Sequence, residues 1–243
     1  MEIEYLGKSD IPLETKIFKY YTIESFLFLI ESNALLFQPI EYWKDIAEGS
    51  LYGVLKRNGY PGTGEEKIRL FGSCWTLHDC YELNGQVEKM RKARIELEKQ
   101  GSSLMWDSYC PNSGIRIETT IKQVIGTMFE NDISGRLVHG KVYYNPDEYY
   151  DEVIDEPLER LIFRKRYSYH SENEYRFIIM TENAERKLLL RKRNICECIN
   201  RILISPNGSK NEWISQVLYK MIYFNITKDV TISQLYGNIS EEI

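Results

Sequence analysis

Short apolar stretches separated by polar and turn-forming residues predict a β-α-β opening. Ile17–Tyr21 is predicted as a strand, and helical spacing over Ile23–Glu31 predicts a short helix. Thr22 is a suitable N-cap for that helix. Leu35–Gln38 is predicted as a second strand that stops before Pro39, since the residue before a proline favours extended backbone over helix.

The rest of the chain mixes further strands and helices. Strands are predicted over Ile68–Thr76, Ile115–Thr119, Gly140–Tyr144, Glu174–Met180 and Ile199–Ser205. Helices are predicted over Cys80–Gln100, Ser103–Tyr109 (a short helix or turn), Ile121–Glu130, Pro157–Arg166 and Glu212–Phe224. No repeat and no linker-like composition interrupts this order. We therefore expect one α+β domain over residues 1–243, with a central mixed or antiparallel sheet and flanking helices.

Composition excludes several classes of protein. With 43% hydrophobic and 28% charged residues the chain is too apolar for a disordered tail, and no run of roughly 18 apolar residues predicts a membrane span. The N-terminus lacks the basic-then-apolar order of a secretory signal. The five cysteines form no CxxC pair, so neither a disulfide framework nor a zinc knuckle is indicated. We expect a cytoplasmic protein without a membrane partner, and its oligomeric state stays open.

Charge is distributed unevenly within a net charge of −5. Residues 147–159 hold seven acids and no base, whereas residues 160–193 hold ten bases and four acids. The basic stretch is a candidate for phosphate or nucleic-acid contact. Solvated surface charge is the simpler interpretation, and the overall acidity argues against broad coating of nucleic acid.

The densest cluster of chemically active side chains is predicted at the start of a late strand. Strand alternation places Glu172, Glu174 and Arg176 on one face, with the two carboxylates about 7 Å apart. Such a pair can hold ribose hydroxyls and stabilise an oxocarbenium-like centre. The alternative is a solvated charge ladder in which Arg176 neutralises Glu174.

A second cluster follows the early strand that ends at Pro39. Tyr42 and Trp43 lie beside Asp45 and Glu48. Aromatic rings beside acids suit a nucleobase or a nicotinamide ring. The equally weighted alternative is that Trp43 anchors the loop in the core. The histidines have no metal-ligand spacing, so no metal is predicted.

Six motifs in order resemble an uncharacterised bacterial family, the domain of unknown function 2971. The resemblance covers about residues 17–206, and residues 207–243 are left as a closing helix and tail. The matching residues are Phe18, Lys19 and Tyr20; Pro39, Trp43, Asp45 and Glu48; Phe71 and Ser73; Leu104, Met105, Trp106, Tyr109 and Gly114; Val142 and Tyr144; and Lys165, Tyr169, Glu172, Glu174, Tyr175 and Arg176. Lys44, Ile46 and Tyr169 depart from the pattern.

Lys19-Tyr20, the helix Ile23–Glu31, the strand Leu35–Gln38 and the late Glu172-x-Glu174 follow one another in an order that loosely resembles the ADP-ribosyltransferases. This resemblance implies NAD as the substrate. It implies that Glu174 orients the nicotinamide ribose and that Glu172 positions the acceptor. Lys19 or Tyr20 stands where that family has the His or Arg that grips the ribose, which is a departure. The remaining nucleotide-binding residues expected are Tyr42 or Trp43 for stacking, Ser73 for a ribose or amide group, and Trp106 and Arg176.

Three functions therefore remain open. The first is an NAD-consuming transferase or glycohydrolase, acting as a bacterial toxin or phage-defence effector on a nucleic-acid or protein acceptor. The second is a non-enzymatic module for a nucleotide or a protein, with Lys19, Lys165 and Arg176 facing a phosphate. The third is a nuclease with Asp45, Glu48, Glu172 and Glu174 around Mg²⁺.

Overall fold

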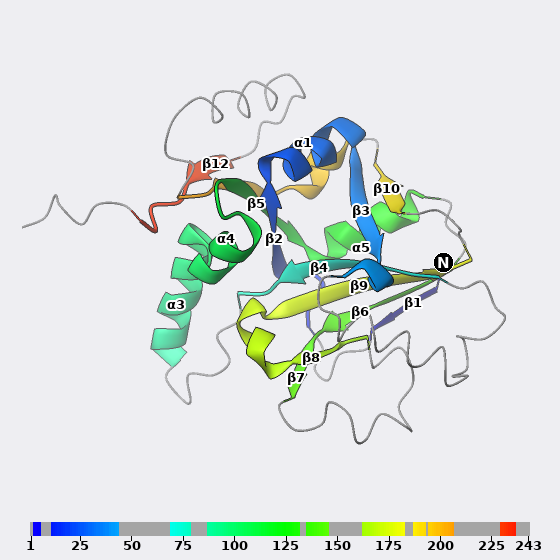
Figure 1. Cartoon of the computed structure of the whole chain (residues 1–243), viewed down its shortest axis with the longest axis horizontal. Coiled ribbons are helices and arrows are strands. Elements are labelled where there is room, and N and C mark those ends of the chain that lie inside the picture. The colour runs from blue at the N-terminus through cyan, green and yellow to red at the C-terminus, as the bar shows by residue number, and fades with distance from the viewer. Residues whose placement is uncertain are drawn as a thin grey trace, which may run out of the picture. The chain divides into compact units, whose positions relative to one another are not determined.

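A computed structural model gives the architecture of the chain (Figure 1). It describes residues 2–5, 11–43, 69–78, 87–131, 135–145, 162–182, 187–192, 194–206 and 229–236. The chain forms two compact units: unit 1 is Met1–Leu13, Leu35–Thr76 and Ile125–Arg191, and unit 2 is Glu14–Ala34, Leu77–Val124 and Lys192–Ile243. Both units contain mixed sheets with helices, so the predicted α+β class is confirmed.

Unit 1 is built on the strand order β1-β6-β9-β4. The strands are β1 (Glu2–Tyr5), β6 (Arg136–Lys141), β9 (Glu174–Thr181) and β4 (Arg69–Thr76). β1 pairs with β6 in parallel, and β6, β9 and β4 pair antiparallel. β3 (Ala34–Pro39) joins β4 and is followed by the 3-10 turn η1 (Ile40–Tyr42), while β10 (Leu188–Arg191) pairs with β3.

The two faces of this sheet differ in character. On one face Val138 and Ile178 are opposite one another and pack with Leu70, Ile40 and Phe163 in a buried cluster. On the other face His139 pairs with Phe177, and both rings contact Tyr175. Alternation along β9 therefore separates an aliphatic face from an aromatic face.

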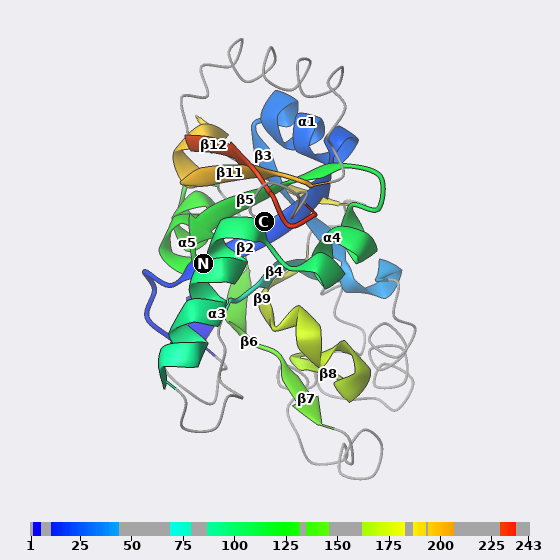
Figure 2. The ribbon, with the colours of Figure 1, turned by 90° about the vertical axis from the view of Figure 1, so that its left-hand side faces the viewer.

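A small extension of unit 1 leads into β9. It consists of the parallel strands β7 (Tyr143–Asn145) and β8 (Arg164–Arg166), followed by the 3-10 segment η3 (Tyr167–Glu172). Figures 1 and 2 show the η3 coil at the start of β9 and beside β7 and β8. Asn173, in the left-handed conformation with φ 43°, turns the chain from η3 into the strand.

Unit 2 has the strand order β2-β5-β11-β12, and its first two pairs are antiparallel. The strands are β2 (Lys16–Thr22), β5 (Gly114–Thr120), β11 (Arg201–Ile204) and β12 (Asp229–Ile232), the last pairing in parallel with β11. The helices are α1 (Ile23–Ser32), α3 (Val87–Gln100) and α4 (Ser103–Tyr109), and the 3-10 turn η4 is Ile195–Cys198. The chain passes from unit 2 to unit 1 within α5 (Ile121–Phe129).

Local signals explain where the helices of unit 2 begin and end. The Thr22 side chain accepts a hydrogen bond from the Ser25 amide and so caps α1, as predicted. Asn33 ends α1 in the left-handed conformation, and Gly101, with φ 82°, ends α3. Within the described residues no helix is long and apolar enough to cross a membrane.

Several predicted boundaries were wrong. Arg164–Arg166, expected at the end of a helix, forms β8, because its backbone pairs with β7. Gly140–Tyr144 is divided between β6 and β7. Glu172 does not lie on the strand with Glu174, because η3 and the left-handed Asn173 intervene.

Other predictions fall partly or wholly outside the described part. The predicted helix Glu212–Phe224 and the acids Asp45 and Glu48 lie outside the described residues, as does the first part of the predicted helix Cys80–Gln100. That the chain is a single domain stays a prediction.

Candidate functional site

Four charged side chains from one segment of unit 1 meet where β9 begins. Lys165 comes from β8, Glu172 from the end of η3, and Glu174 and Arg176 from β9. We call these four residues the β9 ion cluster. Two acids and two bases balance its charge, which lowers the cost of burying it.

Glu174 is the centre of the β9 ion cluster. Its Oε1 accepts a hydrogen bond from Arg176 Nε at 2.7 Å, and its Oε2 accepts from Arg176 Nη2 at 3.0 Å and from Lys165 Nζ at 3.1 Å. Both carboxylate oxygens are therefore engaged. The Glu174 side chain is only 5% exposed, so these bonds are shielded from water.

Glu172 has fewer partners than Glu174. Its Oε2 accepts from Lys165 Nζ at 2.6 Å, so one ammonium bridges the two carboxylates. The Glu172 side chain is 14% exposed, and no hydrogen bond to its Oε1 occurs within the described residues. Glu172 is therefore the more accessible of the two acids.

The electrostatics keep Glu174 ionised. Burial by itself raises the pKa of this carboxyl, but the charges of Arg176 and Lys165 and a hydrogen bond from Cys74 outweigh it and lower the pKa to about 2. Glu174 is thus an anion throughout the physiological range. It therefore carries no proton to donate near neutral pH and is a weak proton acceptor.

Neighbouring backbone and side chains fix the β9 ion cluster in place. Arg176 Nη1 donates to the Ile162 carbonyl, which ties the segment before β8 to β9. The Glu174 amide donates to Tyr144 Oη at 2.8 Å. Burial, reinforced by the Glu174 charge, raises the pKa of Tyr144, so its hydroxyl stays neutral.

Trp43 lies over the same face of the sheet. The Arg176 guanidinium is 4.7 Å from the centre of the Trp43 ring, a cation–π contact. The ring also covers Gly72, where a Cβ atom would overlap it. Trp43 thus packs against the aliphatic cluster of unit 1, as the core alternative predicted.

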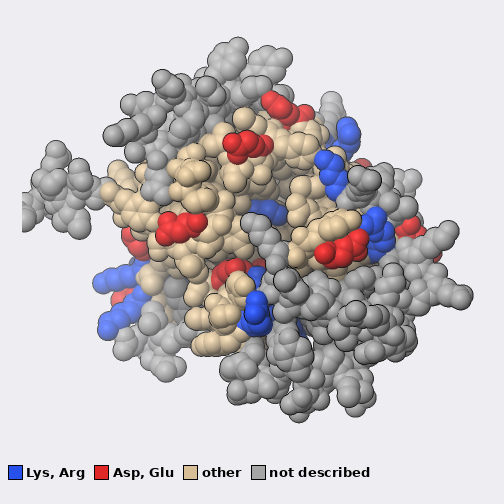
Figure 3. All heavy atoms as spheres, viewed as in Figure 1, with Lys and Arg blue, Asp and Glu red and all other residues tan. Residues whose placement is uncertain are grey.

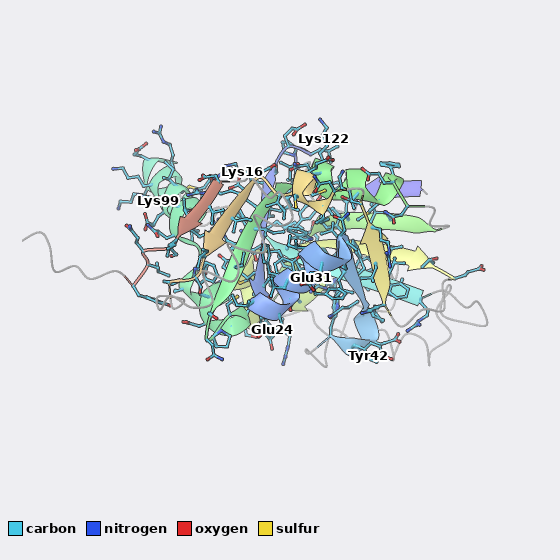
Figure 4. The ribbon with its side chains drawn as sticks, turned by 90° about the horizontal axis from the view of Figure 1, so that it is seen from above. Lys16, Glu24, Glu31, Tyr42, Lys99 and Lys122 are labelled. Atoms are coloured by element: carbon cyan, nitrogen blue, oxygen red, sulfur yellow. The ribbon has the colours of Figure 1, made fainter. Side chains whose placement is uncertain are left out.

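The other candidates in unit 1 do not join the β9 ion cluster. Ser73 is buried and pairs with Phe177, whereas its neighbour Cys74 pairs with Arg176, so Ser73 faces the aromatic side of the sheet. Tyr42 lies on η1 and is 66% exposed, at the outside of the ribbon in Figure 4.

Three further candidates belong to unit 2: Lys19, Tyr20 and Trp106. Tyr20 and Trp106 are buried and meet edge to face at 4.7 Å, and Tyr20 Oη accepts a hydrogen bond from the Ser102 amide. Lys19 points to the opposite face of β2 and lies over the Tyr21 ring at 5.8 Å. Tyr20 and Trp106 therefore act as core residues of unit 2.

Metal binding finds no support among the described residues, where no group of three or more His, Cys, Asp or Glu side chains comes together. Glu172 and Glu174 already share the Lys165 ammonium. Asp45 and Glu48, the other acids of the nuclease hypothesis, lie outside the described residues.

The sequence did not identify Lys165 as the partner of both glutamates. Its position between Arg164 and Arg166 suggested a solvated helix end or a phosphate ligand. Strand alternation could have identified it. In an extended segment 164–166 the middle base faces away from the other two and can be buried. The extended conformation itself, however, depends on pairing with β7, which the sequence of this segment does not reveal.

Comparison with protein-family models, curated proteins and solved structures gave no match for this chain. Both resemblances described from the motifs therefore remain predictions.

Proposed function

We propose that this chain breaks the nicotinamide–ribose bond of NAD⁺, as a glycohydrolase or an ADP-ribosyltransferase acting as a cytoplasmic toxin or phage-defence effector. The supporting observation is that Glu172 and Glu174 meet at one ammonium, Lys165. A positively charged ribose centre is stabilised by a carboxylate that is held in place and stays ionised. The β9 ion cluster supplies two carboxylates held at one ammonium, and Glu174 is kept ionised by its neighbours.

Their surroundings favour different roles for the two glutamates. Both oxygens of Glu174 are occupied, whereas Glu172 keeps one oxygen without a hydrogen bond to the described residues and is more exposed. We therefore assign contact with the ribose to Glu172. Glu174 is assigned as a positioning residue that holds Lys165. This assignment reverses the roles implied by the transferase resemblance.

The proposed reaction balances without a metal or an external oxidant. The C1′–N bond of NAD⁺ breaks, its electron pair goes to the ring nitrogen, and neutral nicotinamide leaves. The ribose carbon becomes an oxocarbenium-like centre beside Glu172. Water, or a nucleophile of the acceptor, then adds to that carbon and loses a proton to the solvent.

Nicotinamide release from NAD⁺ tests this proposal. The purified chain is incubated with NAD⁺ alone, with RNA, with DNA and with cell lysate, and nicotinamide is measured by chromatography. Glu172→Gln should lower release by at least a hundredfold while leaving the melting temperature within a few degrees, because Glu172 is at the edge of the cluster. Glu182→Gln, an exposed site just after β9, is the matched control and should retain full release.

Two results would contradict the proposal. One is the absence of nicotinamide release under all four conditions. The other is release by Glu172→Gln at the wild-type rate. Glu174→Gln is not decisive here, since removal of a buried charge partner destabilises the fold as well.

Nucleotide binding without turnover is the second candidate. The charged side chains of the β9 ion cluster are paired with one another and Arg176 lies against the Trp43 ring, an arrangement that holds the segment in place and does not itself require a reaction. A thermal-shift series with NAD⁺, ADP-ribose and ATP separates the candidates, because a ligand that binds only the folded chain raises its melting temperature. Stabilisation without nicotinamide release would favour the binding module.

A further inference from the structure

Helix α3 presents a charged outer face that the proposed NAD chemistry does not use. Among its residues 88–100 only Gln100 is buried, so the helix adds little to the core of unit 2. Spacing of i, i+4, i+7 and i+11 places four exposed residues on one side of the helix: Glu88, Lys92, Ile95 and Lys99. We call these four residues the α3 outer stripe.

The C-terminal end of α3 is held firmly to unit 2. The buried Arg116 guanidinium, from β5, donates to the Leu97 carbonyl at 2.7 Å and to the Glu98 carbonyl. Lys16, from β2, lies 3.3 Å from Glu98 Oε2. Figures 1 and 2 show α3 at the periphery of unit 2. A helix fixed in this way offers its exposed side as a rigid surface, which lowers the entropic cost of association.

The charges on the exposed side of α3 have no partners within the described part of the chain. The side chains of Glu88, Lys92, Glu96 and Lys99 form no ion pair and no hydrogen bond with a described residue. Acidic and basic side chains lie close together at the lower left of Figure 3, where α3 lies in Figure 1. Both signs therefore alternate along one helix face, which suits a partner of matching alternation better than a uniformly charged polymer.

We propose that this partner is a second copy of the chain, with the two α3 helices packed antiparallel about a two-fold axis that passes between Lys92 and Ile95. A rise of about 1.5 Å per residue then places Glu88 opposite the partner's Lys99, and symmetry repeats that contact. Ile95 meets the methylene stem of the partner's Lys92. Glu96, at the edge of the α3 outer stripe, lies beside the ammonium of the same lysine. Each charge of the stripe thus meets its opposite.

The size and chemistry of this contact define the kind of dimer. One pair of helices buries less than the roughly 1,600 Å² of a standard stable interface, so the association is weak and concentration-dependent. Exposed ion pairs are screened by salt, so it is also sensitive to ionic strength. This inference goes beyond the proposed NAD chemistry and does not depend on it.

Sedimentation equilibrium of the full chain tests the proposal. A monomer–dimer equilibrium is expected at low salt, and its dissociation constant should rise at least about tenfold between about 50 mM and about 500 mM NaCl. Glu88→Lys alone, or Lys99→Glu alone, places like charges opposite one another at two symmetric positions. Each should raise the dissociation constant at least about tenfold.

Recombining the reversed charges makes the test specific for the antiparallel register. In an equal mixture of Glu88→Lys and Lys99→Glu chains, every lysine at these positions faces a glutamate, so mixed dimers should form. The double variant Glu88→Lys/Lys99→Glu should also dimerise by itself, with a dissociation constant near that of the wild type.

Charge reversals on other elements provide the controls. Glu182→Lys and Lys122→Glu change exposed side chains outside α3 and should dimerise like the wild type, and circular dichroism checks that every variant is folded. Glu172→Gln should dimerise whether or not it releases nicotinamide, which separates this proposal from the previous one. A chain that is monomeric up to its solubility limit at low salt, a dimer unaffected by either single reversal, or no recovery in the mixture would overturn the proposal.

Discussion

At the scale of single residues, Glu174 combines near-complete burial with a permanent charge. Burial alone would favour the neutral acid, so the charge persists because Arg176 and Lys165 surround it. A residue in this position stabilises its neighbours as much as they stabilise it. Breaking such an arrangement by removing one partner is far more costly than breaking an ion pair at the surface.

Glu174→Gln should therefore lower the free energy of unfolding by about 3–5 kcal/mol, because Arg176 and Lys165 would be left buried without their common partner. Urea denaturation measures this change. Glu182→Gln serves as the control and should change stability by less than about 0.5 kcal/mol, as is usual for exposed substitutions. Equal small effects in both variants would show that the β9 ion cluster contributes little to folding.

At the scale of elements, Gly72 and Asn33 allow segments distant in the sequence to pack closely. Gly72 on β4 lets the Trp43 ring rest on the sheet, where it also meets Arg176. Asn33 ends α1 and bonds two backbone groups of a distant segment: its Nδ2 donates to the Lys192 carbonyl and its Oδ1 accepts from the Ile195 amide. Both residues act through backbone geometry and close approach rather than through hydrophobic burial.

Gly72→Ala should destabilise the fold by about 1–3 kcal/mol, because the new methyl group would overlap the Trp43 ring. In the double variant Gly72→Ala/Trp43→Ala, the loss of unfolding free energy should be smaller than the sum of the losses in the two single variants, by at least about 0.5 kcal/mol. Gly126→Ala, in α5 with open space around its Cα, is the control and should stabilise by up to about 1 kcal/mol. Additive effects of Gly72 and Trp43 would disprove the contact.

Asn33→Gly and Asn33→Ala separate the two tasks of Asn33. The Asn33→Gly variant keeps the left-handed backbone but lacks both side-chain hydrogen bonds, so its free energy of unfolding should fall by about 1–2 kcal/mol. In the Asn33→Ala variant the free energy of unfolding should fall by about 1 kcal/mol more, because alanine disfavours a φ of 53°. If alanine proves as stable as glycine in thermal or urea unfolding, backbone conformation is not what Asn33 provides.

At the scale of the whole molecule, stability should depend on pH through two buried histidines. Burial lowers the pKa of His139 to about 4, and burial together with Arg116 and Arg94 lowers the pKa of His78 well below 6.5. His78 stacks on Phe18 at 3.9 Å, and neither of its ring nitrogens has a hydrogen-bond partner among the described residues. Both rings are therefore neutral in the folded chain at neutral pH.

The unfolded chain takes up protons on these histidines below about pH 6.5, while the folded chain does so only at lower pH. The contribution of the neutral histidines to the free energy of unfolding is therefore fully present above about pH 6.5. It is lost as the pH falls toward 4. For His139 the loss between pH 7 and pH 5 should be about 2 kcal/mol.

In the His139→Asn variant, the free energy of unfolding measured by urea denaturation should fall less between pH 7 and pH 5 than in the wild type. An unchanged pH dependence in His139→Asn would refute this explanation.

The sequence by itself determined the local elements. The β-α-β opening and the Thr22 cap follow from interactions within a few residues, and those predictions were confirmed. The ends of α1 and α3 at Asn33 and Gly101 rest on equally local backbone conformations. The α+β class followed from the same patterns. The identity of the acids in the candidate site was also evident, because three charges lie within five positions from Glu172 to Arg176.

Only the tertiary structure decided how these charges are used. Lys165 became the common partner of Glu172 and Glu174 because β8 pairs with β7, and strand pairing between distant segments leaves no periodicity in the sequence of either segment. The same holds for Trp43 on Gly72, which depends on β4 lying beneath η1. Short-range propensities form the elements, whereas the partners of a buried charge are set by which elements come together.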